Sequence, residues 1–191
     1  MTLNKIFTIL LLLSITSGCS YIEKRKYKKY INRTVERLYN SELILPDSII
    51  NFDSISLPEF FYSNLHKCQI ISWVDGNCHT CIQALRIWEE DIIQKSNPNY
   101  VNFVFIIHPS DYEYFKKIIF PDIPTDIPIF IDINNDFINV NELFMLDHYL
   151  LTFLIDTEGK IKLIGNPLNN QKLQDLYFQE INIEPTSKSG Y

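Results

Sequence analysis

Glycine is scarce in this 191-residue chain, with only five residues, and none forms the glycine-rich loop that cradles a phosphate group. Positive charge is also in deficit, because 17 lysine and arginine residues stand against 23 aspartate and glutamate residues. A chain with a net charge of −6 is not expected to bind nucleic acid. No second pair of cysteine or histidine residues recurs at zinc-finger spacing, which disfavours a structural zinc site. The 46% hydrophobic content is nevertheless ample for the core of one domain.

The hydrophobic stretch near the N-terminus, Ile6–Ile15, is too short to span a bilayer as a helix, which takes about 20 residues. It follows Lys5 and leads into Thr16–Cys19, a group of small residues ending in a cysteine. This order resembles a bacterial lipoprotein signal, in which residues 1–18 are removed and Cys19 receives lipid. The resemblance implies a protein of the bacterial cell envelope, anchored to a membrane through Cys19 and facing the periplasm. An ordinary signal peptide cut nearby and an uncleaved anchor are the alternatives.

Residues 19–40 form a basic and aromatic segment that we interpret as a tether. Ile31, Val35 and Leu38 in this segment follow a partial helical spacing. The segment can lie against anionic lipid headgroups beside the acyl anchor. It can equally be a solvated, partly helical linker, which is the commoner role of a charged run.

Two cysteines, Cys78 and Cys81, lie where a predicted strand passes into a predicted helix. The run Cys68–Val74 is rich in residues that favour a buried strand, and Asp75-Gly76 signals a turn. Asn77 is a good helix N-cap, which predicts Cys78 at the first helical position. The inward face of the helix is then expected to consist of Cys81, Leu85, Trp88 and Ile92.

This placement has chemical consequences for the two sulfurs. Residues three apart share a helix face, so Cys78 and Cys81 can close a disulfide. The partial positive charge and unpaired N–H groups of a helix N-terminus stabilise a thiolate at Cys78, and a protonated His79 adds to this. Such a thiol titrates below the free cysteine pKa of about 8.5. Cys81, one turn deeper, is expected to be more buried and to act as the resolving thiol.

Three other interpretations of the cysteine pair stay open: a structural disulfide, half of a zinc site, or two unrelated cysteines. Disulfides form and persist in exported proteins, so pairing between Cys78 and Cys81 is expected. Cys68 is then left over, and we expect it to behave as a small buried apolar residue.

Strands and helices alternate after the cysteine helix. Tyr100–Ile107 predicts a parallel strand buried on both faces, which completes a right-handed strand–helix–strand unit. Ser110–Glu113 is a capping box that predicts a helix with Phe115, Ile118 and Ile119 facing inward. Residues 184–191 are mostly polar and are predicted to form a flexible tail. The other predicted elements are extended pieces over 43–46 and 49–52, a strand over 127–131, a helix near 137–144, a hairpin of 149–155 and 160–164 turning at Gly159, and a helix near 170–181.

Two segments, Trp73–Cys81 and Thr152–Ile161, resemble the thioredoxin superfamily, in particular its TlpA/ResA-like membrane-tethered thiol-disulfide proteins. The resemblance implies an α/β thioredoxin-like fold over residues 41–183, with a mixed sheet flanked by helices, an N-terminal extension and a central insertion. It also implies thiol-disulfide exchange with protein thiols or disulfides through Cys78 and Cys81, and no cofactor.

The sequence departs from that family at two places. Asn77 stands where an aromatic residue usually precedes the first cysteine. Leu150 stands where the family has a cis-proline that shapes the substrate groove and helps keep metals off the dithiol. A cis bond before a residue other than proline costs about 3 kcal/mol, so a trans bond is expected before Leu150.

Asp147-His148, followed by Phe153-Leu154, also resembles the corresponding segment of Sco-type copper chaperones. That resemblance implies Cu(I) binding by Cys78, Cys81 and His148, a soft ligand set. Those chaperones have three residues between their cysteines, whereas this chain has two. A third class of function is a non-catalytic surface module, in which the 78–81 disulfide is structural.

Overall fold

The computed structural model describes residues 23–52, 55–63, 68–123 and 127–181. The predicted signal, Cys19 and the tail over 184–191 lie outside these residues. The chain divides into two compact units, one ending at Leu38 and the other starting at Tyr39. Residues 23–38 of the first unit are helical, and the sheet belongs to the second unit. No helix within the described ranges is long and apolar enough to cross a membrane.

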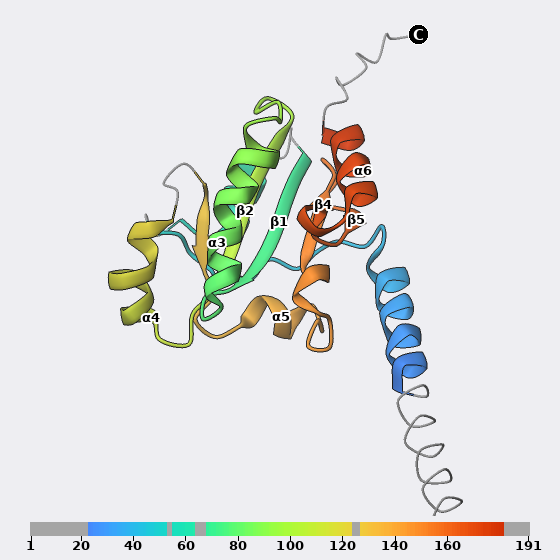
Figure 1. Cartoon of the computed structure of the whole chain (residues 1–191), viewed down its shortest axis with the longest axis horizontal. Coiled ribbons are helices and arrows are strands. Elements are labelled where there is room, and N and C mark those ends of the chain that lie inside the picture. The colour runs from blue at the N-terminus through green and yellow to red at the C-terminus, as the bar shows by residue number, and fades with distance from the viewer. Residues whose placement is uncertain (1–22, 53–54, 64–67, 124–126, 182–191) are drawn as a thin grey trace, which may run out of the picture. The chain divides into compact units, whose positions relative to one another are not determined.

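A five-stranded mixed sheet forms the centre of the second unit (Figure 1). Its strands are β1 (Cys68–Asp75), β2 (Val101–His108), β3 (Ile129–Ile131), β4 (Thr152–Ile155) and β5 (Ile161–Ile164). Their order is β3-β2-β1-β4-β5, in which β1, β2 and β3 run parallel. β4 is antiparallel to β1, and β5 to β4. The predicted hairpin is therefore present, and Gly159 adopts a positive φ of 77° at its turn.

Helices connect the strands and cover the sheet. Helix α3 (His79–Trp88) continues through a π-helical turn, η1 (Glu89–Ile93), and connects β1 to β2 as predicted. The other helical elements are α2 (Leu57–Ser63), α4 (Tyr112–Tyr114), η2 (Phe115–Ile119), η3 (Phe120–Asp122), α5 (Asp136–Val140), η4 (His148–Leu150), η5 (Pro167–Asn169) and α6 (Gln171–Ile181).

The central strands have hydrophobic side chains on both faces, because side chains alternate along a strand. On one face, residues of α3, η2 and α6 pack with the strands in one hydrophobic cluster that includes Leu85, Trp88, Phe115 and Tyr177. On the opposite face, Phe137 of α5 packs edge-on against Phe153 of β4. β1 and β2 are thereby buried along most of their length, as the near-continuous apolar runs predict.

Residues 40–52, here called the belt, join the two edge strands of the sheet. At one edge, Asn40 N donates to Ile161 O at 2.8 Å, and Ile161 N donates to Ser41 O at 3.0 Å. At the other edge, Ile131 N donates to Ile50 O at 2.9 Å. Asn141 holds the middle of the belt. Its Oδ1 accepts the N–H of Ile44 and its Nδ2 donates to the carbonyl of Ile44, each at 2.9 Å. Figure 1 shows this blue-to-cyan segment crossing behind the sheet.

Several predicted details differ from the structure. Asp111, not Ser110, caps α4, because its Oδ1 accepts the N–H of Tyr114 while Ser110 bonds elsewhere. Ile118 is 57% exposed rather than inward. It lies in the π-helical turn η2, where more residues per turn shift a side chain off the face that α-helical spacing predicts. The helix predicted near 137–144 ends at Val140, and residues 148–150 form a 3-10 turn rather than the start of the hairpin strand.

Candidate redox site

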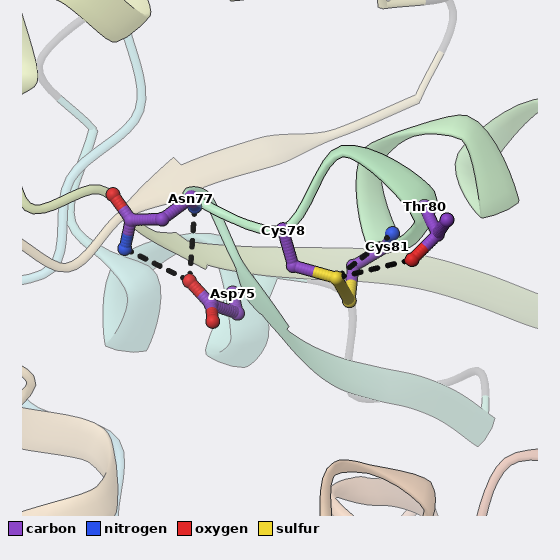
Figure 2. The surroundings of a disulfide bond; sticks show 5 residues. All are labelled: Asp75, Asn77, Cys78, Thr80 and Cys81. Carbon is purple, nitrogen blue, oxygen red and sulfur yellow. Dashed lines mark hydrogen bonds between the residues drawn. A yellow bond between two sulfur atoms is a disulfide. The ribbon is translucent and has the colours of Figure 1, made fainter.

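Cys78 and Cys81 form a disulfide at the start of α3 (Figure 2). Their Cα atoms are 5.2 Å apart, within the usual span of a disulfide. The helix begins one residue later than predicted, at His79, and Cys78 itself is the N-cap, with an extended backbone of φ −91° and ψ 103°. The prediction of Asn77 as N-cap was therefore wrong.

Asn77 is used in a different way, through a network with Asp75 and Ser110. Asp75 Oδ1 accepts hydrogen bonds from both the backbone N–H and the side-chain amide of Asn77, each at 2.9 Å (Figure 2). Asn77 Oδ1 in turn accepts from Ser110 N at 2.9 Å and from Ser110 Oγ at 2.5 Å. Because both ends of the Asn77 amide are engaged, its side chain is not available to cap α3. The network instead ties the cysteine turn to the loop after β2.

Gly76 brings the same turn close to the end of β2. Its N–H donates to His108 O at 2.9 Å. A Cβ atom at this position would lie 3.0 Å from His108 O, from a side-chain carbon of Ile107 and from Pro109 Cα. Two of these three atoms belong to the backbone, so only glycine fits without displacing the chain.

The start of α3 provides a setting that favours negative charge on sulfur. Cys78 Sγ accepts the backbone N–H of Cys81 at 3.3 Å and lies 3.3 Å from Thr80 Oγ1 (Figure 2). No acidic residue occupies the first turn of α3, so nothing there opposes the positive end of the helix dipole. Both cysteines are partly buried, and Cys81 packs against the hydrophobic cluster of the core.

A cleft of about 320 Å³ opens on the Cys81 side of α3. Cys81, Ile87 and Trp88 line one wall, and His148 and Tyr149 line another. Tyr149 is 51% exposed and Ile87 48%, so the cleft has an apolar rim that solvent reaches. Cys78 is not among the residues that line it, so the cleft borders the disulfide on its Cys81 side.

Ser72 of β1 also lines the cleft, and it is paired with Thr152 of β4. The two hydroxyl oxygens lie 2.8 Å apart, and both residues are buried. An unpaired buried hydroxyl costs free energy, so the hydrogen bond between Ser72 and Thr152 stabilises the pairing of β1 with β4. Both residues fell within predicted strands, but the sequence contained no signal that they pair.

The loop at the far wall of the cleft contains Leu150, at the position of the family's proline. No cis peptide bond occurs within the described ranges, so the bond before Leu150 is trans as expected. Leu150 N donates to Asp147 O at 2.8 Å, and Tyr149 O accepts from Asn166 N at 2.6 Å. The loop is therefore held by one backbone hydrogen bond of its own and by one from Asn166.

His148 lines the same cleft as Cys81, with its ring centroid 3.8 Å from that of Tyr149. In this disulfide form, no three histidine, cysteine, aspartate or glutamate side chains of the described residues are grouped as metal ligands. The structure thus brings His148 and Cys81 to one cleft without assembling the three-ligand set that the copper resemblance implies.

Cys68 carries a free thiol at the other end of β1. Its Sγ donates to Tyr100 O at 3.2 Å, and its side chain packs against the hydrophobic core. Burial raises the pKa of this thiol to about 11. Cys68 therefore resembles the apolar core residue that the sequence predicts.

No family model matches the sequence, and no curated protein matches it at a significant level. Solved structures do match the fold. The thioredoxin domain of a thiol-disulfide oxidoreductase from Bacteroides vulgatus superposes with a TM-score of 0.55 at 16% identity, covering 75% of this chain and 98% of that one. An exposed lipoprotein thioredoxin from Streptococcus pneumoniae gives 0.50 at 17% identity, covering 66% and 96%. Copper-bound yeast Sco1 gives 0.51 at 15% identity, covering 78% and 97%.

The predicted α/β thioredoxin-like fold, a mixed sheet flanked by helices, is confirmed by these superpositions and by the sheet topology. The low identities establish the fold alone. Redox proteins and a copper-binding protein both share it, so any argument about activity depends on the residues of this chain.

Proposed function

We propose that this protein is an exported, lipid-anchored thiol-disulfide oxidoreductase that acts on protein thiols or disulfides through Cys78 and Cys81. The observation that supports this proposal is the Cys78–Cys81 disulfide at the start of α3, beside a cleft that solvent reaches. A disulfide whose only role is structural does not require a helix N-terminus aimed at one sulfur or a cleft beside the other.

The exchange is a pair of thiolate attacks. When the protein acts as oxidant, a substrate thiolate attacks Cys78 Sγ, the Cys78–Cys81 bond breaks, and Cys81 leaves as a thiolate. A second substrate thiolate attacks the substrate sulfur of the mixed disulfide, which yields a substrate disulfide and a Cys78 thiolate. Two electrons pass from substrate to protein, and each cysteine thiolate takes a proton according to its pKa. The same steps in reverse make the protein a reductant.

The helix N-terminus contributes by stabilising charge on Cys78. The N–H of Cys81 already points at Cys78 Sγ in the disulfide form, so a thiolate formed there finds a donor in place. A lower thiol pKa makes Cys78 a better leaving group and populates its nucleophilic form.

The proposal is tested by exchange assays with insulin and with a scrambled-disulfide protein. Cys78→Ser is expected to abolish exchange, and Cys81→Ser to accumulate mixed disulfides through Cys78. Cys68→Ser is the matched control and is expected to retain activity, because Cys68 lies at the far end of β1. Wild-type protein that exchanges with neither substrate, and cysteine variants that change only stability, would instead identify a non-catalytic module.

The direction of electron flow follows from the reduction potential of the pair, measured by equilibration with glutathione. A value near about −270 mV, that of thioredoxin, favours a reductant, whereas one near about −120 mV favours an oxidant.

Membrane attachment is proposed through lipid on Cys19, by the lipoprotein-like signal. Mass spectrometry of the protein recovered from bacterial membranes is expected to find an acylated Cys19 as the first residue. Cys19→Ser is expected to shift the protein out of the membrane fraction. An unmodified N-terminus in membrane-bound protein contradicts this part of the proposal.

Cu(I) binding is a second candidate function, favoured by the shared cleft of Cys81 and His148. Two thiolates and one imidazole suit Cu(I), which would be bound as cargo after reduction of the disulfide. The reduced protein is then expected to take up about one Cu(I) per chain, in line with a single soft ligand set. His148→Ala is expected to weaken this uptake, while thiol exchange with insulin continues. Equal copper uptake by both proteins would rule out the role of His148.

A further inference from the structure

The charge of this chain is divided between its two units. Residues 23–38 contain seven lysine and arginine residues and two glutamates, a net charge of +5. Residues 39–191 contain nine lysine and arginine residues and 21 aspartate and glutamate residues, a net charge of −12. The overall charge of −6 therefore conceals a short basic unit followed by a strongly acidic one.

The basic residues are gathered on one side of a regular helix. Residues 23–38 are helical without interruption, a rod about 24 Å long at 1.5 Å per residue. One surface of this helix is lined by Asn32, Glu36 and five exposed basic side chains: Arg25, Lys26, Lys28, Lys29 and Arg33. Thr34 and Leu38 follow a different stripe of the helix and are buried. The exposed basic side chains therefore form a face, here called the basic face.

We propose that the basic face binds the anionic headgroups of a membrane. The choice of a membrane rests on the proposed lipid on Cys19, which lies only six residues before Arg25. Six residues reach at most about 20 Å, so an acyl chain inserted at Cys19 keeps the basic face close to the headgroups. An anionic membrane surface attracts the basic face and repels the acidic unit that carries the disulfide. At moderate salt, both forces act over a Debye length of about 10 Å.

This second contact supplements the anchor. Binding of a lipidated protein strengthens when basic side chains also meet an anionic surface. Because residues 39–191 carry net negative charge, the same lipid surface does not attract them. The basic face is therefore the part of the chain that an anionic membrane selects.

The test uses an unlipidated chain that begins at residue 19 and carries Cys19→Ser, which retains every residue that the structure describes. Co-sedimentation is measured with vesicles of phosphatidylglycerol mixed with phosphatidylcholine, and with phosphatidylcholine alone. We expect binding to the anionic vesicles only, and loss of that binding as sodium chloride is raised. The variant Lys26→Gln/Lys29→Gln/Arg33→Gln is expected to lose affinity by about fivefold for each charge removed. Circular dichroism checks that its helix content is unchanged.

The matched control neutralises three exposed lysines of the second unit, as Lys95→Gln/Lys117→Gln/Lys172→Gln. It removes the same charge and is expected to lose far less affinity for the anionic vesicles than the basic-face variant, because its three lysines lie outside the basic face. Equal losses in the two triple variants would overturn the proposal, as would equal binding to neutral vesicles. Binding to a duplex oligonucleotide without binding to anionic vesicles would show that the basic face has a different partner. Because no variant in the series retains an acyl anchor or changes Cys78 or Cys81, failure here is separate from failure of lipidation or thiol exchange.

Discussion

Ser110 donates two hydrogen bonds, one from its backbone N–H and one from its hydroxyl, to the same Oδ1 atom of Asn77. Asn77 directly precedes Cys78, and its own amide is held by Asp75. The turn that presents the first cysteine is therefore fixed to the loop that follows β2.

Asn77→Ala is expected to raise the pKa of reduced Cys78 and to make the reduction potential of the pair more negative. The reason is that the variant frees the turn that holds Cys78 Sγ toward the N–H of Cys81, so the thiolate loses stabilisation. Thiolate absorbance across pH and equilibration with glutathione measure the two quantities. Asn97→Ala is the control, because Asn97 Oδ1 likewise accepts a backbone N–H, that of Asn99, in an exposed turn elsewhere. Equal redox changes in both variants would show that the Asn77 network has no specific effect.

Gly76→Ala is expected to destabilise the folded protein by about 1–3 kcal/mol, the usual cost of forcing an extra carbon into a packed site. The added Cβ would meet His108 O and Pro109 Cα at 3.0 Å, and neither backbone atom can move without shifting β2. Urea unfolding measures the loss. Gly159→Ala provides a comparison, because the nearest atoms there are 4.0 Å away and only its positive φ is strained. A neutral Gly76→Ala would mean that the turn moves away from β2 at little cost.

Cys68 is expected to make the folded state less stable as pH rises above 9. The pKa of its buried thiol is raised to about 11 from an ordinary value of 9.0, so the folded protein retains this proton where the unfolded chain has lost it. Stability contributed in this way is complete below pH 9 and is lost as pH approaches 11. Urea unfolding across this range checks the slope, and Cys68→Ala is expected to reduce it. Iodoacetamide at neutral pH is expected to label Cys78 of the reduced protein well before Cys68.

Ser72→Ala is expected to cost about 1–3 kcal/mol, because it leaves the buried hydroxyl of Thr152 without its partner. The double variant Ser72→Ala/Thr152→Val removes both hydroxyls and is expected to cost less than the sum of the single variants. A double-mutant cycle in urea measures this coupling. Additive losses would contradict a direct interaction between the two residues.

Local patterns predicted the elements around the site because the physical cause lies within a few residues. The apolar run of β2, the turn at Asp75-Gly76 and the helical spacing of Leu85, Trp88 and Ile92 are all local, and all were confirmed. The start of α3 was misplaced by one residue, because the competitor for the Asn77 side chain is Ser110, 33 positions away.

The remaining differences have the same origin. Ser110 stands at the first position of a capping-box sequence, but its hydroxyl donates to Asn77. Asp111 caps α4 instead, by accepting the N–H of Tyr114. Ile118 follows α-helical spacing, but the chain there winds as a π-helical turn. The cleft itself brings together β1, α3 and the 148–149 loop, and periodicity along one segment cannot show which loop of another segment lies opposite.

The belt constrains the order in which this domain can be completed. Its first residues bond Ile161, near the end of the domain, while Ile50 bonds the other edge of the sheet at Ile131. When the chain is synthesised from its N-terminus, helix α3 is complete before Ile131 and Ile161 are made. The belt therefore lacks both of its hydrogen-bond partners at the stage when α3 can already fold. Cys78 and Cys81 can thus meet an oxidant before the domain closes, whereas the edge at β3 stays uncovered until Ile131 is present and the edge at β5 until Ile161 is present.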